Sequence, residues 1–156
     1  MRTKPIRAED VAATKGETIY PKPFASAVAG RTKRRLGDVF GLTNFGINLT
    51  HLDPGAVSAL THWHSVQDEF VYVLQGVATV AFGDMEYELE AGDCIGFKAG
   101  TGIAHQVVNR TGEPVTYIEV GDRSPGEKGE YSDADLTFEY GTDGSLIAMH
   151  KDGTPY

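Results

Sequence analysis

The stretch THWHSVQDEF, residues 61–70, places two histidines one residue apart and an acidic pair shortly after the second. On a β-strand, side chains at i and i+2 project from the same face, so His62 and His64 can both point into one interior. A carboxylate from the next strand would complete a two-histidine, one-carboxylate site of the kind that suits first-row metals. The stretch therefore predicts a metal site carried on strands; the alternative is an ordinary polar strand.

Strand alternation favours Glu69 over Asp68 as the carboxylate. Glu69 shares its face with Val71 and Val73, which are typical inward residues, whereas Asp68 shares the opposite face with Phe70.

A fourth ligand is available downstream if the strand that carries His105, in GTGIAHQVVN, lies beside the first histidine strand. Asn48, Tyr72 and Gln106 are the side chains that we expect to line the cavity, and no second general base stands out beside the ligands.

The rest of the chain indicates an all-β fold. Its 19 glycines and 7 prolines divide 156 residues into short pieces, and no helical period is sustained over three turns. The pieces are rich in β-branched and aromatic residues and are separated by turn sequences such as Asp53-Pro54-Gly55. This pattern is typical of a sandwich or barrel of the jelly-roll kind. The candidate strands are 44–52, 59–64, 69–74, 77–82, 86–89, 94–97, 105–109 and 115–120.

The two flanks of this β block differ from it in composition. Residues 1–35 contain three prolines and end in the basic run RTKRR, residues 31–35, so we expect an arm or extra strands there, with the run itself as a solvated loop rather than an anion site. We expect residues 36–156 to form a single barrel domain. Within it, GDRSPGEKGEYSDAD, residues 121–135, is predicted to be a polar loop, and a late hairpin is predicted around Thr142-Asp143-Gly144.

Charge and composition exclude several function classes. The formal net charge is −8, which makes nucleic acid and anionic membranes poor partners. The N-terminal stretch lacks the apolar segment of a signal peptide, and no segment approaches about 18 apolar residues, so we expect a soluble, cytoplasmic protein. Cys94 is the single cysteine, which excludes an intrachain disulfide and a cysteine-based zinc module. We expect Cys94 to be a small buried residue.

Two segments resemble the paired motifs of the cupin superfamily. GAVSALTHWHSVQDEFVYVLQG, residues 55–76, is similar to the first motif, with a glycine, H-x-H, a glutamate and a closing glycine. GDCIGFKAGTGIAHQVVN, residues 92–109, is similar to the second motif, with His105 at the motif histidine and Asn109 at the motif asparagine. Lys98 replaces the usual motif proline, and four residues rather than two separate Gly100 from His105, which lengthens a loop at the barrel rim.

The resemblance implies a double-stranded β-helix barrel with His62, His64, Glu69 and His105 as ligands of a divalent metal: zinc, iron, manganese, nickel or copper. It also implies a small-molecule ligand inside the barrel and a homodimer in which the N-terminal arm is a plausible exchanged element. Superfamily members include dioxygenases, isomerases, decarboxylases, lyases and non-catalytic binders, so the fold does not select a reaction. The leading hypothesis is an enzyme that uses the metal for Lewis-acid or dioxygen chemistry on a small metabolite. The alternative is a non-catalytic binding or sensor protein with a structural metal.

Overall fold

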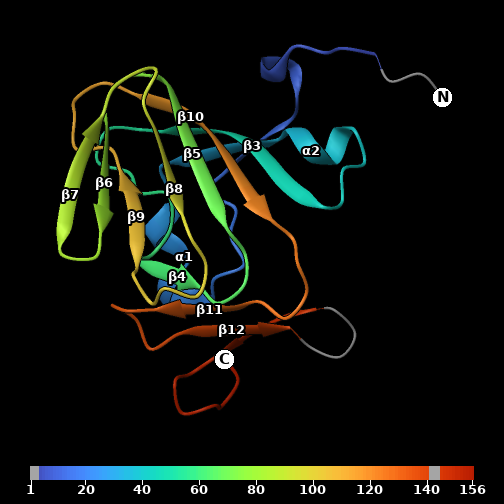
Figure 1. Ribbon diagram of the computed structural model, residues 1–156, viewed down its shortest axis with the longest axis vertical. Coiled ribbons are helices and arrows are strands. Elements are labelled where there is room, and N and C mark those ends of the chain that lie inside the picture. The colour runs from blue at the N-terminus through green and yellow to red at the C-terminus, as the bar shows by residue number, and fades with distance from the viewer. Residues whose placement is uncertain (1–3, 141–144) are drawn as a thin grey trace.

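The computed structural model describes residues 4–140 and 145–156, and it consists mainly of two antiparallel sheets that face each other (Figure 1). The first sheet has the order β1 (Ala13–Lys15), β2 (Arg31–Arg35), β3 (Phe45–Leu52), β10 (Val115–Asp122), β5 (Glu69–Gln75) and β8 (Cys94–Phe97). The second has the order β13 (Leu146–Met149), β12 (Thr137–Tyr140), β11 (Lys128–Tyr131), β4 (His62–His64), β9 (His105–Val108), β6 (Ala78–Phe82) and β7 (Met85–Leu89). This arrangement confirms the predicted jelly-roll class.

The main core fills the space between the sheets because their strands alternate inward and outward residues. On β5, Val71 and Val73 are fully buried, while the alternating residues Phe70 and Tyr72 are exposed. Burying each such valine is worth about 1.5–3 kcal/mol. The buried members of this core are Leu52, Val71, Val73, Ala78, Val80, Leu89, Phe97, Val107, Val115 and Tyr117.

A second, smaller core joins the N-terminal arm to the C-terminal strands. Tyr20 stacks on Phe138 with ring centroids 6.1 Å apart and meets Tyr131 edge-on at 5.6 Å. Val28 and Leu136 are fully buried in the same cluster. The arm that leads to these contacts contains the short helices η1 (Ala8–Asp10), α1 (Lys22–Ala25) and η2 (Ser26–Val28), and α2 (Leu36–Val39) follows β2. Segments far apart in sequence, the N-terminal arm and the C-terminal strands, are therefore packed together.

The basic run does not form the solvated loop that the sequence predicted. It forms β2, which pairs with β3 along its whole length, from Arg31 opposite Leu52 to Arg35 opposite Asn48. Pairing with the edge of β3 satisfies backbone groups that a loop would expose to water, and it buries Arg31.

Two further predictions need correction. Residues 121–135 are not a continuous polar loop, because β10 extends to Asp122 and β11 pairs with β4. The burial of Tyr131 in the second core gives this polar segment a reason to order. Cys94 is exposed, because at the outer strand β8 it shares the outward face of its partner Tyr72.

The late hairpin is described only by its two strands, β12 and β13, which pair antiparallel. Its predicted turn, Thr142-Asp143-Gly144, lies outside the described residues. Within residues 4–140 and 145–156, none of the helices has the length and apolar character needed to cross a membrane.

The turn between β5 and β6 provides a test of the fold. Gly76 has φ +82°, and a Cβ placed there would lie 2.6 Å from the carbonyl oxygen of Pro114. We therefore expect Gly76→Ala to lower the free energy of unfolding by about 2 kcal/mol or more, because backbone strain and a clash add. Gly55→Ala is the matched control, since Gly55 has φ +77° and open space around it. Urea denaturation of both variants makes the comparison, and equal losses would contradict the role of the clash.

Candidate metal centre

Four side chains predicted from the sequence meet inside one end of the barrel. His62, His64, Glu69 and His105 each offer a ligand atom, and these atoms all lie within 4.8 Å of one another. Nε2 of His64 is 3.4 Å and Nε2 of His105 is 3.2 Å from Oε2 of Glu69. Neighbouring ligands of one ion with bonds of about 2.1 Å lie about 3 Å apart, so the spacing of this donor set fits a single ion.

Strand pairing brings these residues together. His62 on β4 lies directly opposite His105 on β9, as required for His105 to join the site. Glu69 begins β5 on the facing sheet, opposite Phe97 of β8. The Phe97 ring stacks on the His105 ring at a centroid distance of 3.7 Å, which fixes the imidazole plane.

Hydrogen bonds orient two of the imidazoles. His62 Nδ1 lies 2.8 Å from the carbonyl oxygen of Leu60, which can only accept, so Nδ1 carries the proton and Nε2 keeps its lone pair. His64 Nδ1 lies 3.2 Å from Oε1 of Glu127. Such contacts on the remote ring nitrogen are typical of metal-binding histidines. Both rings therefore turn Nε2 toward the centre.

Glu127 is a structural partner that sequence reasoning missed. Its buried carboxylate also accepts hydrogen bonds from the backbone amides of Ser65, Val66 and Gln67, at 2.9, 3.0 and 2.6 Å. These bonds hold the loop between His64 and Glu69. No spacing rule in the sequence marks Glu127, because it comes from the segment predicted to be a polar loop.

The electrostatics favour the metal-binding forms of Glu69 and His62, whereas His64 holds its proton more strongly. Burial would raise the pKa of Glu69, but hydrogen bonds with His105 and His64 outweigh it and hold the pKa well below the usual value. Burial and the neighbouring His105 lower the pKa of His62 to about 3. For His64, burial is outweighed by Glu69 and Glu127, so its pKa is raised. An ionised carboxylate and a neutral imidazole are the forms in which these groups bind metals.

The remaining sequence candidates have other positions. Asp68 is exposed and accepts a hydrogen bond from the amide of Ala99 at 2.9 Å, outside the cluster. Asn109 is fully buried, and its Nδ2 donates to the carbonyls of Leu52 and Glu113 at 3.1 and 2.8 Å, so it supports the fold past the end of β9 that is remote from His105.

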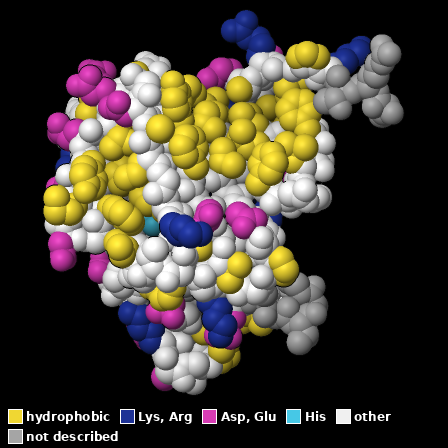
Figure 2. Space-filling model, viewed as in Figure 1, with side chains coloured by type: hydrophobic (Ala, Val, Ile, Leu, Met, Phe, Trp, Pro, Cys, Tyr) yellow, Lys and Arg dark blue, Asp and Glu magenta, His cyan; other side chains and the backbone are white. Residues whose placement is uncertain are grey.

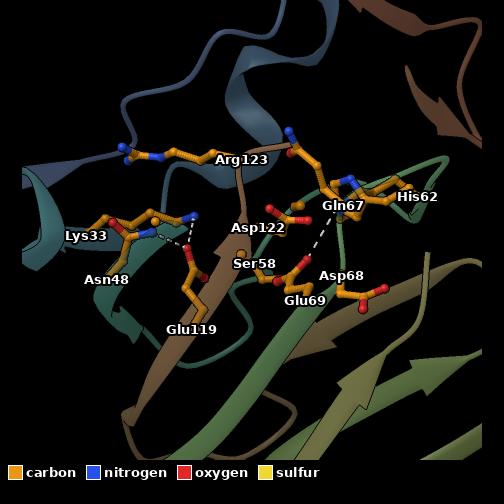
Figure 3. A pocket seen from close by; sticks show the side chains of 14 residues that line it. Lys33, Asn48, Ser58, His62, Gln67, Asp68, Glu69, Glu119, Asp122 and Arg123 are labelled. Carbon is orange, nitrogen blue, oxygen red and sulfur yellow. Dashed lines mark hydrogen bonds and ion pairs between the residues drawn. The ribbon is translucent and has the colours of Figure 1, made fainter. Parts of the chain in front are cut away.

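The cluster opens into a polar cleft of about 350 Å³. Asn48 lines this cleft as predicted, whereas Tyr72 lies on the outer face of β5, and Gln106 donates to the carbonyl of Ala59 instead. The structure adds Glu119 of β10 to the cleft wall. Figure 3 shows Lys33 and Asn48 pointing at its carboxylate, with Nζ of Lys33 at 2.5 Å and Nδ2 of Asn48 at 2.9 Å from Oε1.

Glu119 was missed although a signal for it exists. Val115, Tyr117 and Glu119 alternate inward along β10, and a buried carboxylate at the third position of such a series indicates a polar interior. Its partner Lys33 could not be identified from the sequence, because only the pairing of β2 with β3 places the basic run beside the cleft.

Comparison with known proteins identifies the class. Residues 48–121 match the family described as Cupin domain. The chain is 38% identical, over 98% of its own length and 96% of the other chain, to a sugar phosphate isomerase from a cupin superfamily of Silicibacter pomeroyi, with a TM-score of 0.90. The protein therefore belongs to the cupin superfamily.

Two other solved structures are similar. A proposed sugar phosphate isomerase from Acidithiobacillus ferrooxidans is 29% identical over 78% of this chain and 77% of its own, with a TM-score of 0.71. The polyketide cyclase RemF from Streptomyces resistomycificus shares the fold at 21% identity, 81% and 84% coverage and a TM-score of 0.65. A comparison with curated proteins gives no significant match.

Proposed function

We propose that this cupin is a metal-dependent isomerase that acts on a small hydroxycarbonyl metabolite, most simply a sugar phosphate. The observation that carries the proposal is the presence, in one cleft, of a four-ligand cluster and a separate buried carboxylate, Glu119. The name of the Silicibacter pomeroyi protein supports the substrate class, since that protein is 38% identical along nearly the whole chain.

His62, His64, Glu69 and His105 would hold the divalent ion, which when bound would act as a Lewis acid toward substrate oxygens. Zinc, iron, manganese, nickel and copper all suit three imidazoles and one carboxylate. The fixed Nε2 directions of His62 and His64 pre-organise this arrangement, because their Nδ1 atoms are already engaged by Leu60 and Glu127.

Glu119 would move the proton. Interconversion of an aldose and a ketose requires removal of a proton from the carbon beside the carbonyl and its return to the former carbonyl carbon, while the hydroxyl proton passes to the carbonyl oxygen, with no change in overall composition. The Glu119 carboxylate would accept this proton and give it back, while Lys33 and Asn48 keep the carboxylate in place. This role gives the cleft the base that the sequence did not reveal.

A non-catalytic binding protein is the second candidate. The hydrogen bonds of Glu119 with Lys33 and Asn48 favour this candidate. A carboxylate whose hydrogen bonds are already satisfied is consistent with a purely structural role, here the connection of β2 and β3 to β10. The two candidates differ in whether Glu119 exchanges a proton with the ligand.

We also propose a homodimer. The outer face of the first sheet carries cross-strand apolar rows, in which Val120 lies between Ile47 and Phe70, and Ile118 between Leu49 and Tyr72. Hydrophobic side chains gather over this part of the molecule in Figure 2. Apolar surface of this kind typically marks an interface. The arm, the exchange element expected from the sequence, pairs with β3 of its own chain, so the apolar face is the stronger basis for a dimer.

The metal proposal predicts that His64→Ala loses stoichiometric metal after dialysis, because a ligand is removed from the cluster. His51→Ala is the matched control, since His51 lies on β3 outside the cluster, with Nδ1 3.1 Å from Oγ1 of Thr116. Elemental analysis of protein purified without a chelating tag measures the content, and circular dichroism checks the fold. Equal metal content in folded His64→Ala and wild-type protein would contradict the assignment.

The isomerase proposal predicts deuterium incorporation into a sugar phosphate by metal-loaded protein in deuterated water, followed by proton NMR on glucose 6-phosphate, fructose 6-phosphate and ribose 5-phosphate. We expect Glu119→Gln to lower kcat by about 10²- to 10⁴-fold with unchanged metal content, because the proton carrier is lost. Glu113→Gln, in the exposed turn before β10, is the control. A wild-type protein that binds these compounds without exchange or turnover would favour the binding protein.

The dimer proposal predicts that Phe70→Glu produces a monomer on size exclusion with light scattering, because a charge on the apolar face opposes its burial. Tyr87→Glu is the control, since Tyr87 is similarly exposed but lies on β7 of the other sheet. A Phe70→Glu protein with the mass of the wild-type dimer would refute this interface, and so would a wild-type monomer.

A further inference from the structure

The strand formed by the basic run separates its cations between two faces. Arg31, Lys33 and Arg35 alternate along β2 and line a cleft of about 450 Å³ beside the metal centre. Arg34 lies on the opposite face, where its Nη2 is 3.7 Å from Oε2 of Glu9. Strand formation thus gathers three cations that a loop would leave scattered.

A fourth cation, Arg123, follows directly after the last residue of β10. The guanidinium of Arg123 packs against Gly46, where a Cβ would lie 3.4 Å from Nε, and it donates to the carbonyl of Leu42 and to Oδ1 of Asp38 at 3.1 and 3.0 Å. Among the described lining residues, four cations face the carboxylates of Glu17 and Asp38, and Lys33 also pairs with Glu119, so four cations meet three carboxylates. In a chain with a net charge of −8, this cleft is a local excess of positive charge.

The cleft lined by the β2 cations is continuous with the cleft into which the His62, His64, Glu69 and His105 cluster opens. Lys33, Asn48 and Arg123 line both, and Figure 3 shows the cationic ends of Lys33 and Arg123 on the opposite side of the pocket from His62. Across the first sheet, Arg35 of β2 pairs with Asn48 of β3, and Asn48 pairs with Glu119 of β10. Glu119 in turn pairs with Val71 of β5, which is two residues from Glu69. Three strand spacings of about 4.8 Å place the backbones of β2 and β5 about 14 Å apart. Long side chains from both strands leave room for a small molecule between them.

Arg35 is the cation most available to a ligand. Its Nη2 donates to Oε2 of Glu17 across 3.4 Å, and both side chains are more than half exposed. Such a pair contributes little and is readily replaced by an anion that accepts two guanidinium hydrogen bonds. Buried Arg31 has a different role, because its guanidinium is engaged by the carbonyls of Ser58 and Glu17 and supplies only its charge.

From these contacts we propose that Arg35 and Arg123 form a phosphate subsite, with the phosphoryl group of a sugar phosphate at this end and its hydroxycarbonyl end at the metal centre, while Lys33 stays paired with Glu119 between the two ends. The proposal rests on the proposed function and adds to it the place where the phosphoryl group of the substrate binds. A planar guanidinium recognises a phosphoryl oxygen pair bidentately, which explains arginine at the two more exposed positions.

Calorimetric titration of the metal-loaded full chain with ribose 5-phosphate, ribose and inorganic phosphate tests the subsite. We expect ribose 5-phosphate to bind more tightly than ribose, and Arg35→Gln and Arg123→Gln each to weaken its binding by about tenfold or more, since each removes a charge-assisted hydrogen bond. Arg34→Gln is the matched control: it removes the same charge from the same strand but from the opposite face, and should change binding less than twofold.

Repeating the phosphate titration after chelation separates this proposal from the metal proposal. Phosphate binding that persists without metal and is lost in Arg35→Gln supports the subsite even if the cluster proves to bind no metal. Three results would overturn it: equal binding of ribose and ribose 5-phosphate, equal weakening by Arg34→Gln and Arg35→Gln, or phosphate binding that requires metal and is unchanged in Arg35→Gln.

Discussion

The carboxylate of Glu69 inside the barrel is the constraint on which the site depends. An ionised group in an apolar interior is unstable unless opposite charges or hydrogen bonds compensate it, and here the imidazoles of His64 and His105 do so at 3.4 and 3.2 Å. Their positions require β4, β9 and β5 to meet at one end of the barrel, which fixes the register of both sheets there. The fold and the site therefore share one set of contacts.

The apolar interior is accordingly arranged in two parts around a polar zone. The main core fills the closed end of the barrel, and the cluster of Tyr20, Tyr131 and Phe138 supports the other end. Tyr131 connects this second cluster to the site, because it pairs with His62 and its ring stacks over the imidazole at 5.5 Å. The C-terminal strands therefore help to position His62, which lies some seventy residues earlier in the chain.

Most of the barrel and three members of the cluster could be predicted from sequence, because they rest on local rules, whereas His105 was assigned through the resemblance to the second cupin motif. The alternation of Glu69 with Val71 and Val73 selected the inward carboxylate, and the H-x-H spacing placed two imidazoles on one face. The interpretation of the basic run was wrong, since isolated charges favour solvent and only the exposed edge of β3 makes a strand of RTKRR. Glu127 was missed for a related reason: its carboxylate satisfies backbone amides in a distant loop, and sequence distance conceals such a contact.

The N-terminal arm is more than an addition to the barrel. Without the arm, β3 would be the unpaired edge strand of the first sheet, and the cleft wall would contain Glu119 but not its partner Lys33. By pairing with β3, the arm satisfies the edge and neutralises a carboxylate that faces the same cleft as Glu69. It also brings its remaining cations to the cleft, where an anionic substrate would be oriented with one end toward the arm and the other toward the histidines. On the proposed arrangement, the metal cluster would supply chemistry common to many cupins, and the arm would supply the selectivity for a particular ligand.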